Sequence, residues 1–378
     1  MRTQRLLTSE SLMLDIIRVL ASVVVAFGHH TLPWCSTGWG DRTPQARCAV
    51  AVFFVLSGFI IRYVTTLRAS TLRTYMGDRL SRIYSVAIPA LLFTLIADTV
   101  GRHFNPAFYV QFDSTYSPRP ILHVLANLAF AGQLWQHTIE PLSNSPYWSV
   151  NYEMAYYLGY GFFFYLSGIG RWLAILLLCL VVGPHILYLA PLWIAGCFIH
   201  DLYQRWNLAG TTAHNLFRSF AASLLFAASV LWVRIAHHAL LHRSALSSTA
   251  IHQNRLTPID YAFGIVWLPI FMGILFIARR WDRTLGPAFV KQIRFVSEGT
   301  FPIYLFHYPM FILAAALIPY NHQHAWPKLL LLAVAMMFGI LAGDPCNRFK
   351  DRLRILFARR RSNHAFPSTP IVQQKEVS

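Results

Sequence analysis

Residues 11–30 read SLMLDIIRVLASVVVAFGHH, which has the length and apolarity of a membrane-spanning helix, because a bilayer core requires about 20 mostly apolar residues. The stretch nevertheless carries side chains that ionise or hydrogen-bond, namely Asp15, Arg18, Ser22, His29 and His30. An ionisable group in hydrocarbon costs about 2.5–3.5 kcal/mol, so its presence there indicates function. The stretch therefore predicts a first transmembrane helix that is also part of a site.

The spacing of these side chains puts most of them on one face of the helix. At about 100° per residue, Arg18 and His29 return to within about 20° of each other. Ser22 lies about 40° from Arg18, and Asp15 lies about 60° away on the other side. His30 points elsewhere. One interpretation is a polar stripe that lines a site; the alternative is a helix held to its neighbours by polar contacts.

Composition indicates a polytopic membrane protein. The chain is 56% hydrophobic and 12% charged, whereas soluble domains average about 25% charged residues. The net charge of +17 would suit nucleic acid, but the basic residues lie in short links between apolar segments, so we expect no nucleic-acid partner. We expect eleven apolar segments, at residues 12–30, 48–67, 83–100, 121–137, 147–167, 172–188, 191–203, 216–237, 258–278, 299–318 and 327–343.

The basic links predict the membrane topology. Lys and Arg concentrate in 68–82, in 279–294 and in the tail after 343, and the positive-inside rule puts all three in the cytoplasm. With both termini inside, the number of crossings is even, so one of the eleven segments does not cross. Segment 121–137 is the weakest, because it is short and contains His123, Asn127 and Gln133.

We therefore predict an all-α, polytopic helix bundle of about ten transmembrane helices plus one re-entrant segment. The predicted membrane domain covers 12–343, and a basic cytoplasmic tail, partly disordered, covers 344–378. The short, mixed N-terminus does not resemble a cleavable leader. The five cysteines show no CxxC spacing, so we expect no metal or redox framework. Cys35 and Cys48 share the first outer loop, which leaves a disulfide open in an oxidising compartment.

Two further spans carry polar groups. Ser57 in the second span either packs against a neighbouring helix or lines a site. Glu153 lies inside an aromatic, apolar span, with Ser149 one helical turn before it on the same face. A carboxylate there must be paired, protonated or functional. Trp148 stands at the entry of this span, where tryptophan is common at the membrane interface.

Two pairs of side chains share a helical face because they are three residues apart. Arg79 and Arg82 stand at the predicted cytoplasmic mouth, where two guanidinium groups suit a phosphate-bearing ligand. Topological anchoring or contact with anionic lipid is the alternative. Tyr304 and His307 lie in the span near the C-terminus, and His307 serves either a site or a structural hydrogen bond.

Five ordered motifs resemble one family. LDIIRVLASVVVAFGHH resembles the LDxLRxxA…HH opening of integral-membrane acyltransferase family 3, which includes O-acetylases of O-antigens, exopolysaccharides and nodulation factors. FFVLSGFIIRY, RLSRIY, YWSVNYEMAYYL and FPIYLFHYPM are similar to its later motifs in the same order, and the likeness spans about residues 12–350. The residues flanking Glu153 and the Asp344-Pro345 pair depart from the usual pattern, but no presumed functional residue is lost.

The resemblance implies a bacterial inner-membrane enzyme that moves an acyl group, commonly acetyl from acetyl-CoA, to a hydroxyl of a cell-surface saccharide or lipid-linked glycan. Arg79 and Arg82 would hold the CoA phosphates, and no metal is expected. His29 would act as general base, oriented by Glu153, with Arg18 on the same stripe. An acyl-histidine intermediate is a second route. The supporting residues would be Asp15, His30, Ser57, Trp148, Ser149, Tyr304 and His307.

Two other functions use the same residue types. A transporter or flippase could carry a proton relay of His, Glu and Arg, although the sequence shows no inverted repeat of the kind many transporters have. An acyl-group exporter that passes its cargo to another enzyme is the third hypothesis. The sequence leaves open the acceptor, the modified hydroxyl, the acyl chain length and the oligomeric state.

Overall fold

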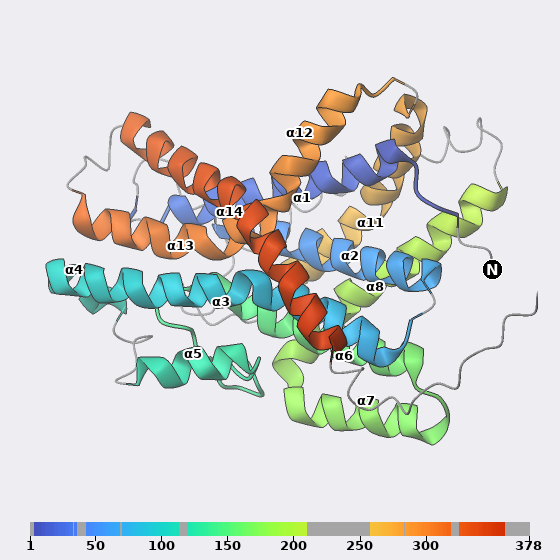
Figure 1. The fold of residues 1–378 in the computed structure, drawn as a ribbon, viewed down its shortest axis with the longest axis horizontal. Coiled ribbons are helices and arrows are strands. Elements are labelled where there is room, and N and C mark those ends of the chain that lie inside the picture. The colour runs from blue at the N-terminus through green and yellow to red at the C-terminus, as the bar shows by residue number, and fades with distance from the viewer. Residues whose placement is uncertain are drawn as a thin grey trace, which may run out of the picture.

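The chain folds into helices throughout the part that the structure describes (Figure 1). The computed structural model describes residues 4–32, 34–35, 43–68, 70–112, 119–209, 258–282, 284–318 and 325–359. The α-helices are α1 (Thr8–His30), α2 (Thr43–Leu67), α3 (Leu72–Phe104), α4 (Pro106–Tyr109), α5 (Pro120–Leu128), α6 (Trp148–Tyr165), α7 (Gly168–Val182), α8 (Pro184–Ala209), α11 (Pro258–Ala278), α12 (Pro287–Glu298), α13 (Thr300–Leu317) and α14 (Ala325–Arg359). Short 3-10 turns are η1 (Val110–Phe112), η2 (Ser145–Tyr147) and η3 (Arg279–Trp281).

Six of the described helices are long and apolar enough to cross a membrane, namely α1, α2, α3, α8, α13 and α14. This supports the predicted membrane helix bundle. The count of ten crossings stays a prediction, because it also relies on segment 216–237, which lies outside the described residues. Helix α7 is apolar but has only 15 residues.

The segment predicted to be re-entrant, 121–137, contains one short helix. Helix α5 has nine residues, which gives about 14 Å of rise, and turns follow it. A hydrocarbon core is about 30 Å thick, so this helix is too short to cross one. How deeply it inserts stays a prediction.

The region 68–82, expected as a cytoplasmic loop, is instead mostly part of a long helix. Helix α3 begins at Leu72, where the side chain of Thr71 caps the backbone N–H of Thr74 at 3.3 Å, and it continues for 33 residues. Arg79 and Arg82 therefore stand on a helix that runs on into the bundle. Helix α14 continues through residue 343, so the first part of the predicted tail is helical.

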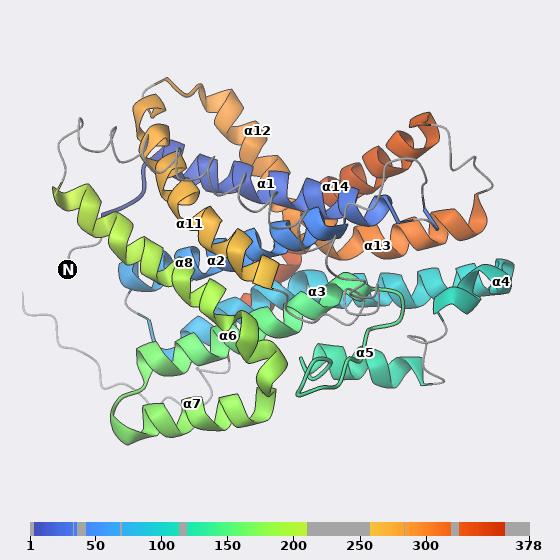
Figure 2. The same cartoon turned by 180° about the vertical axis from the view of Figure 1, so that it is seen from behind.

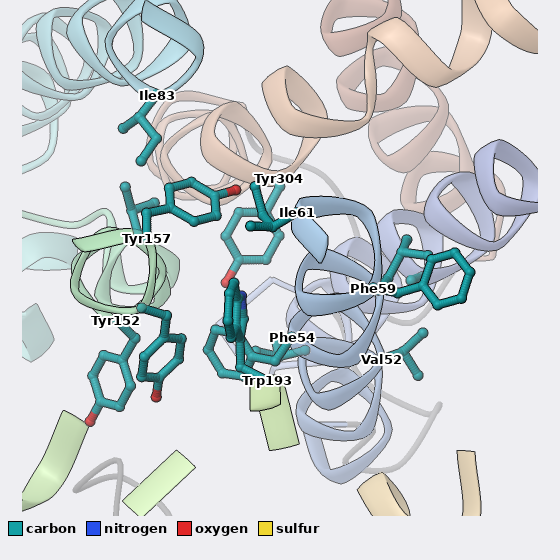
Figure 3. Packing of buried hydrophobic residues seen from close by; sticks show 14 of the residues in the cluster. Val52, Phe54, Phe59, Ile61, Ile83, Tyr152, Tyr157, Trp193 and Tyr304 are labelled. Atoms are coloured by element: carbon teal, nitrogen blue, oxygen red, sulfur yellow. The ribbon is translucent and has the colours of Figure 1, made fainter. Parts of the chain in front are cut away.

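The helices surround a shared centre. Helix α13 lies between α1 and α3, and α2 packs against both α1 and α8 (Figures 1 and 2). Helix α7 lies at the periphery and packs on α6 and α8. Figure 3 shows Tyr157, Trp193 and Tyr304 converging on the side of α2 that carries Phe54, while Phe59 points away from the opposite side. Helices far apart in sequence thus bring their side chains to one side of α2.

The backbones of α2 and α8 touch through two glycines. A Cβ atom added to Gly58 would lie 1.9 Å from the carbonyl oxygen of Trp193, and one added to Gly196 would lie 2.0 Å from that of Val55. Small residues permit this close approach between membrane helices. The contact brings the indole of Trp193 within hydrogen-bonding distance of Ser57, at 3.2 Å.

Substituting Gly58 by alanine will force these two helices apart. We expect Gly58→Ala to lower the free energy of unfolding by about 1–3 kcal/mol, as overpacking of a tight interface does. The melting temperature in detergent, followed by circular dichroism, measures the effect. Gly170→Ala is the matched control, because a Cβ there meets nothing within 4 Å. Equal melting temperatures for the two variants would contradict the backbone contact.

Candidate functional site

A cavity of about 90 Å³ lies where α1, α2, α3, α6 and α13 meet. Its polar lining comes from Arg18, Ser57, Arg79, Arg82, Ser149, Glu153, Tyr157, Thr300 and Tyr304. The rest of the lining is largely apolar and aromatic and includes Phe53, Phe54 and Phe301. Except for Tyr157 and Thr300, each of these polar residues was among those predicted from sequence. The structure therefore gathers seven of the twelve predicted residues around one space.

The lining carries three guanidinium groups and one carboxylate. Arg79 lies between two aromatic rings, with its Cζ 5.9 Å from the centroid of Tyr75 and 5.8 Å from that of Tyr157. Its Nε is buried and has no hydrogen-bond partner among the described residues. A buried donor left unpaired is costly, so the cavity is suited to a ligand that brings anionic oxygens to Arg79 and Arg82.

Asp15 lies outside the cavity and divides its carboxylate between two arginines. Its Oδ1 lies 3.3 Å from Nη1 of Arg18, and its Oδ2 lies 3.2 Å from Nη1 of Arg294 on α12. Arg294 also donates to Oγ of Ser11 at 3.3 Å. Asp15 was predicted from the sequence but Arg294 was not, because nothing in the local pattern indicates that α12 packs on α1.

Glu153 is anchored through one oxygen. Oγ of Ser57 donates to its Oε1 at 2.8 Å, and the hydroxyl of Tyr157 donates to the same atom. Nε1 of Trp193 donates in turn to Oγ of Ser57 at 3.2 Å. Both hydrogen bonds end on Oε1, so Oε2 has no protein donor among the described residues. Tyr157 follows Glu153 by one turn and could have been predicted from spacing, whereas Trp193 carries no local signal.

Ser149 and Tyr304 connect α6 to α13. The hydroxyl of Tyr304 donates to the carbonyl of Pro146 at 3.0 Å and accepts from Oγ of Ser149 at 2.7 Å. Trp148 does not line the cavity. Its ring packs edge-on against that of Tyr152, with ring centroids 4.9 Å apart. Trp148 therefore supports the helix that carries Glu153.

The loop before α6 also fixes a turn of α13. Pro309 lies inside α13 and has no N–H, so it leaves the carbonyl of Leu305 without its helical donor. Nδ2 of Asn144 takes that place, donating to the Leu305 carbonyl at 2.9 Å, and also donates to Oγ1 of Thr94 at 3.0 Å. One buried amide thus connects the loop, α3 and the kinked turn of α13.

His29 lies outside the cavity and pairs with His307. Nδ1 of His29 is 2.9 Å from Nε2 of His307, and the two rings are within 6° of parallel. Tyr308 packs edge-on against His29. His30 is buried and packs edge-on against Phe311, with ring centroids 5.3 Å apart. The two histidines thus point to different surroundings, as their 100° offset predicted.

The expected orientation of His29 by Glu153 is wrong in this structure. The hydrogen bonds of Glu153 involve Ser57 and Tyr157, and that of His29 involves His307. The physical reason is the packing, because α13 is the helix that lies along α1 and carries His307. Tyr304 lies between the cavity and the histidine pair, because it lines the cavity and its ring centroid lies 6.3 Å from that of His307.

Together these features define a helical membrane protein with a cavity lined by cations and a buried histidine pair beside it. The sequence profile of acyltransferase family 3, described as an acyltransferase domain, matches residues 12–343. The chain belongs to this family. No curated protein and no solved structure matches the chain. The described residues contain no group of three His, Cys, Asp or Glu side chains that could hold a metal ion.

Proposed function

We propose that this membrane acyltransferase moves an acetyl group from acetyl-CoA to a hydroxyl of a cell-surface saccharide or lipid-linked glycan. The observation that carries the proposal is the convergence of Arg18, Arg79 and Arg82 on one cavity. Guanidinium groups bind phosphate oxygens through a planar fork of donors, and CoA is a phosphate-rich acyl donor. Family membership supplies the acyl-transfer chemistry.

In the proposed mechanism Arg79 and Arg82 hold the phosphates of the donor. Eleven residues separate Arg18 from His29, which is about 16 Å of helix rise, a distance that a pantetheine arm can cover. His29 removes the proton from the acceptor hydroxyl while the oxygen attacks the thioester carbon. The tetrahedral intermediate then expels the CoA thiolate, which takes up the proton. The products are an acetate ester and CoA.

The covalent alternative uses the same histidine. His29 would attack the thioester carbon through its free nitrogen, release CoA and then pass the acetyl group to the hydroxyl. Mass spectrometry of the protein quenched in acid, after incubation with donor alone, distinguishes the two routes. An added acetyl group on the peptide containing His29 would favour the covalent route, and its absence at full activity would favour the general base.

The experiment that tests the function is a transfer assay. The full-length protein, purified and reconstituted in liposomes, is incubated with acetyl-CoA labelled in the acetyl group and with candidate glycans. We expect an acetate ester on one acceptor, formed in equal amount with free CoA. Label that crosses the membrane without forming an ester, while CoA stays acetylated, would favour the transporter hypothesis. Release of acetyl to a separate enzyme would favour the exporter.

The proposal includes a location, a bacterial inner membrane with both termini in the cytoplasm. Residues 12–343 form the membrane domain, surrounded by membrane lipids, and residues 344–378 form the cytoplasmic tail. A reporter enzyme that is active only outside this membrane should be silent when fused after residue 360. A fusion after residue 112, which follows the third crossing, should be active and serves as the control. Strong activity of the first fusion would contradict this topology.

A further inference from the structure

His307 makes two hydrogen bonds from a fully buried ring. Its Nδ1 is 2.9 Å from the carbonyl oxygen of Ile303, and its Nε2 is 2.9 Å from Nδ1 of His29. The side chain is 0% exposed. The rings of His29 and His307 are nearly parallel with centroids 5.2 Å apart, while their nitrogens are much closer. The rings therefore meet rim to rim, which aligns an N–H of one with a lone pair of the other.

The backbone contact decides which nitrogen carries which proton. A carbonyl oxygen only accepts, so Nδ1 of His307 must be protonated and donate to Ile303. In a neutral imidazole the other nitrogen is then an acceptor. Nε2 of His307 therefore accepts, and Nδ1 of His29 must donate to it. The remaining nitrogen of His29, Nε2, is left with a lone pair.

The opposite arrangement is unfavourable. If Nδ1 of His29 accepted the bond, His307 would have to be protonated on both nitrogens and carry a charge. The rings around His307 are aromatic, those of Tyr304, Tyr308 and Phe311. A buried cation without a paired anion is strongly disfavoured. When both imidazoles are neutral, Nδ1 of His29 donates to Nε2 of His307, and Nδ1 of His307 donates to the carbonyl of Ile303. Both contacts are then hydrogen bonds.

We propose that His307 is the positioning residue that holds His29 in the tautomer with its lone pair on Nε2. The inference rests on the proposed function, in which His29 Nε2 takes the proton of the acceptor hydroxyl. When that proton arrives, His29 becomes an imidazolium, and its hydrogen bond from Nδ1 to His307 becomes charge-assisted and stronger. His307 keeps its own proton throughout. It occupies the place that a carboxylate has in other histidine-dependent sites.

The test compares two substitutions at the same position. Glutamine can accept the hydrogen bond from Nδ1 of His29 through its side-chain oxygen, whereas phenylalanine fills the space but cannot accept it. We expect His307→Phe to lower kcat about 10- to 100-fold, the range found when the hydrogen-bond partner of a metal-ligating histidine is removed. Donor affinity should stay unchanged. His307→Gln should recover most of kcat.

The pH profile of kcat supplies a second readout that a merely structural role would not move. Without an acceptor for its Nδ1–H, the imidazolium of His29 is less stable, so the limb of the profile that reports the base should move to lower pH in His307→Phe. Glutamine should restore its position. Donor binding and melting temperature, measured on the same preparations in liposomes, report folding.

The outcomes separate this inference from the proposed function. If the wild-type protein makes no ester from acetyl-CoA, both fail. If the wild-type protein is active, His29→Ala is inactive and His307→Phe keeps wild-type kcat and pH profile, only the role of His307 is overturned. Equal losses in the Gln and Phe variants with an unmoved pH profile would likewise overturn it, because they would show that His307 acts in packing alone.

Discussion

Replacing His29 by alanine will abolish acyl transfer while the protein still folds and still binds its donor. The cavity proposed to hold the donor is lined by the arginines and does not include His29, so we expect the substitution to remove chemistry rather than binding. Loss of a general base costs about 10²–10⁴ in rate, and loss of a covalent nucleophile would leave essentially no activity. The initial rate of ester formation at saturating donor, with donor affinity measured alongside, checks the prediction.

His30→Ala is the natural comparison, because the two histidines are adjacent but face different neighbours. His30 packs on Phe311 and is not part of the pair with His307. We expect His30→Ala to reduce activity less, through packing, at matched expression and melting temperature. A fully active His29→Ala protein would end the proposed mechanism. Loss of activity in His30→Ala alone would mean that His30, rather than His29, is the reactive histidine.

Removing the two arginines of α3 that line the cavity will weaken the binding of the donor. Arg79 and Arg82 line the cavity together, and each charge-assisted contact is worth about 1.5–3 kcal/mol. With partial compensation by Arg18, we expect the double substitution Arg79→Ala, Arg82→Ala to cost about 2–4 kcal/mol of binding free energy, which is about 30- to 1000-fold in affinity. Isothermal titration of the reconstituted protein with acetyl-CoA measures it.

The control for this experiment is an arginine outside the cavity. Arg348 on α14 is exposed and pairs with Asp344, so Arg348→Ala removes positive charge without touching the cavity. Its donor affinity should match that of the wild-type protein. If the double variant also binds donor normally and is folded, the arginine pair is a topology signal and holds no phosphate.

Spacing along single helices predicted much of the candidate site. Arg79 and Arg82 share a face because they are three residues apart, and both line the cavity. Ser149 and Glu153 are four residues apart, which also puts them on one face, and both line the cavity. Apolarity likewise predicted a helical membrane protein, and the five motifs identified the family that the sequence profile shows. These features depend on local periodicity and composition, which are written in the sequence itself.

The contacts between helices could not be predicted in the same way. His29 and His307 are 278 residues apart, and Ser57 and Trp193 are 136 apart. Which helices become neighbours depends on the packing of the whole bundle, so His29 was predicted to pair with Glu153 instead. The boundaries of 68–82 were also misjudged, because charged side chains mark the end of an apolar run but do not stop a helix.

The hydrogen bond from the Asn144 amide to the backbone of α13 affects how firmly His307 is held. It completes the backbone of α13 at the turn opened by Pro309, two residues beyond His307, from a loop that is itself buried. The turn of α13 that carries His307 is therefore held by the buried loop, and this turn becomes ordered once, during folding. In the proposed mechanism, each catalytic cycle then begins with the imidazole of His29 already oriented, and no conformational freedom of that turn has to be lost when the substrate binds.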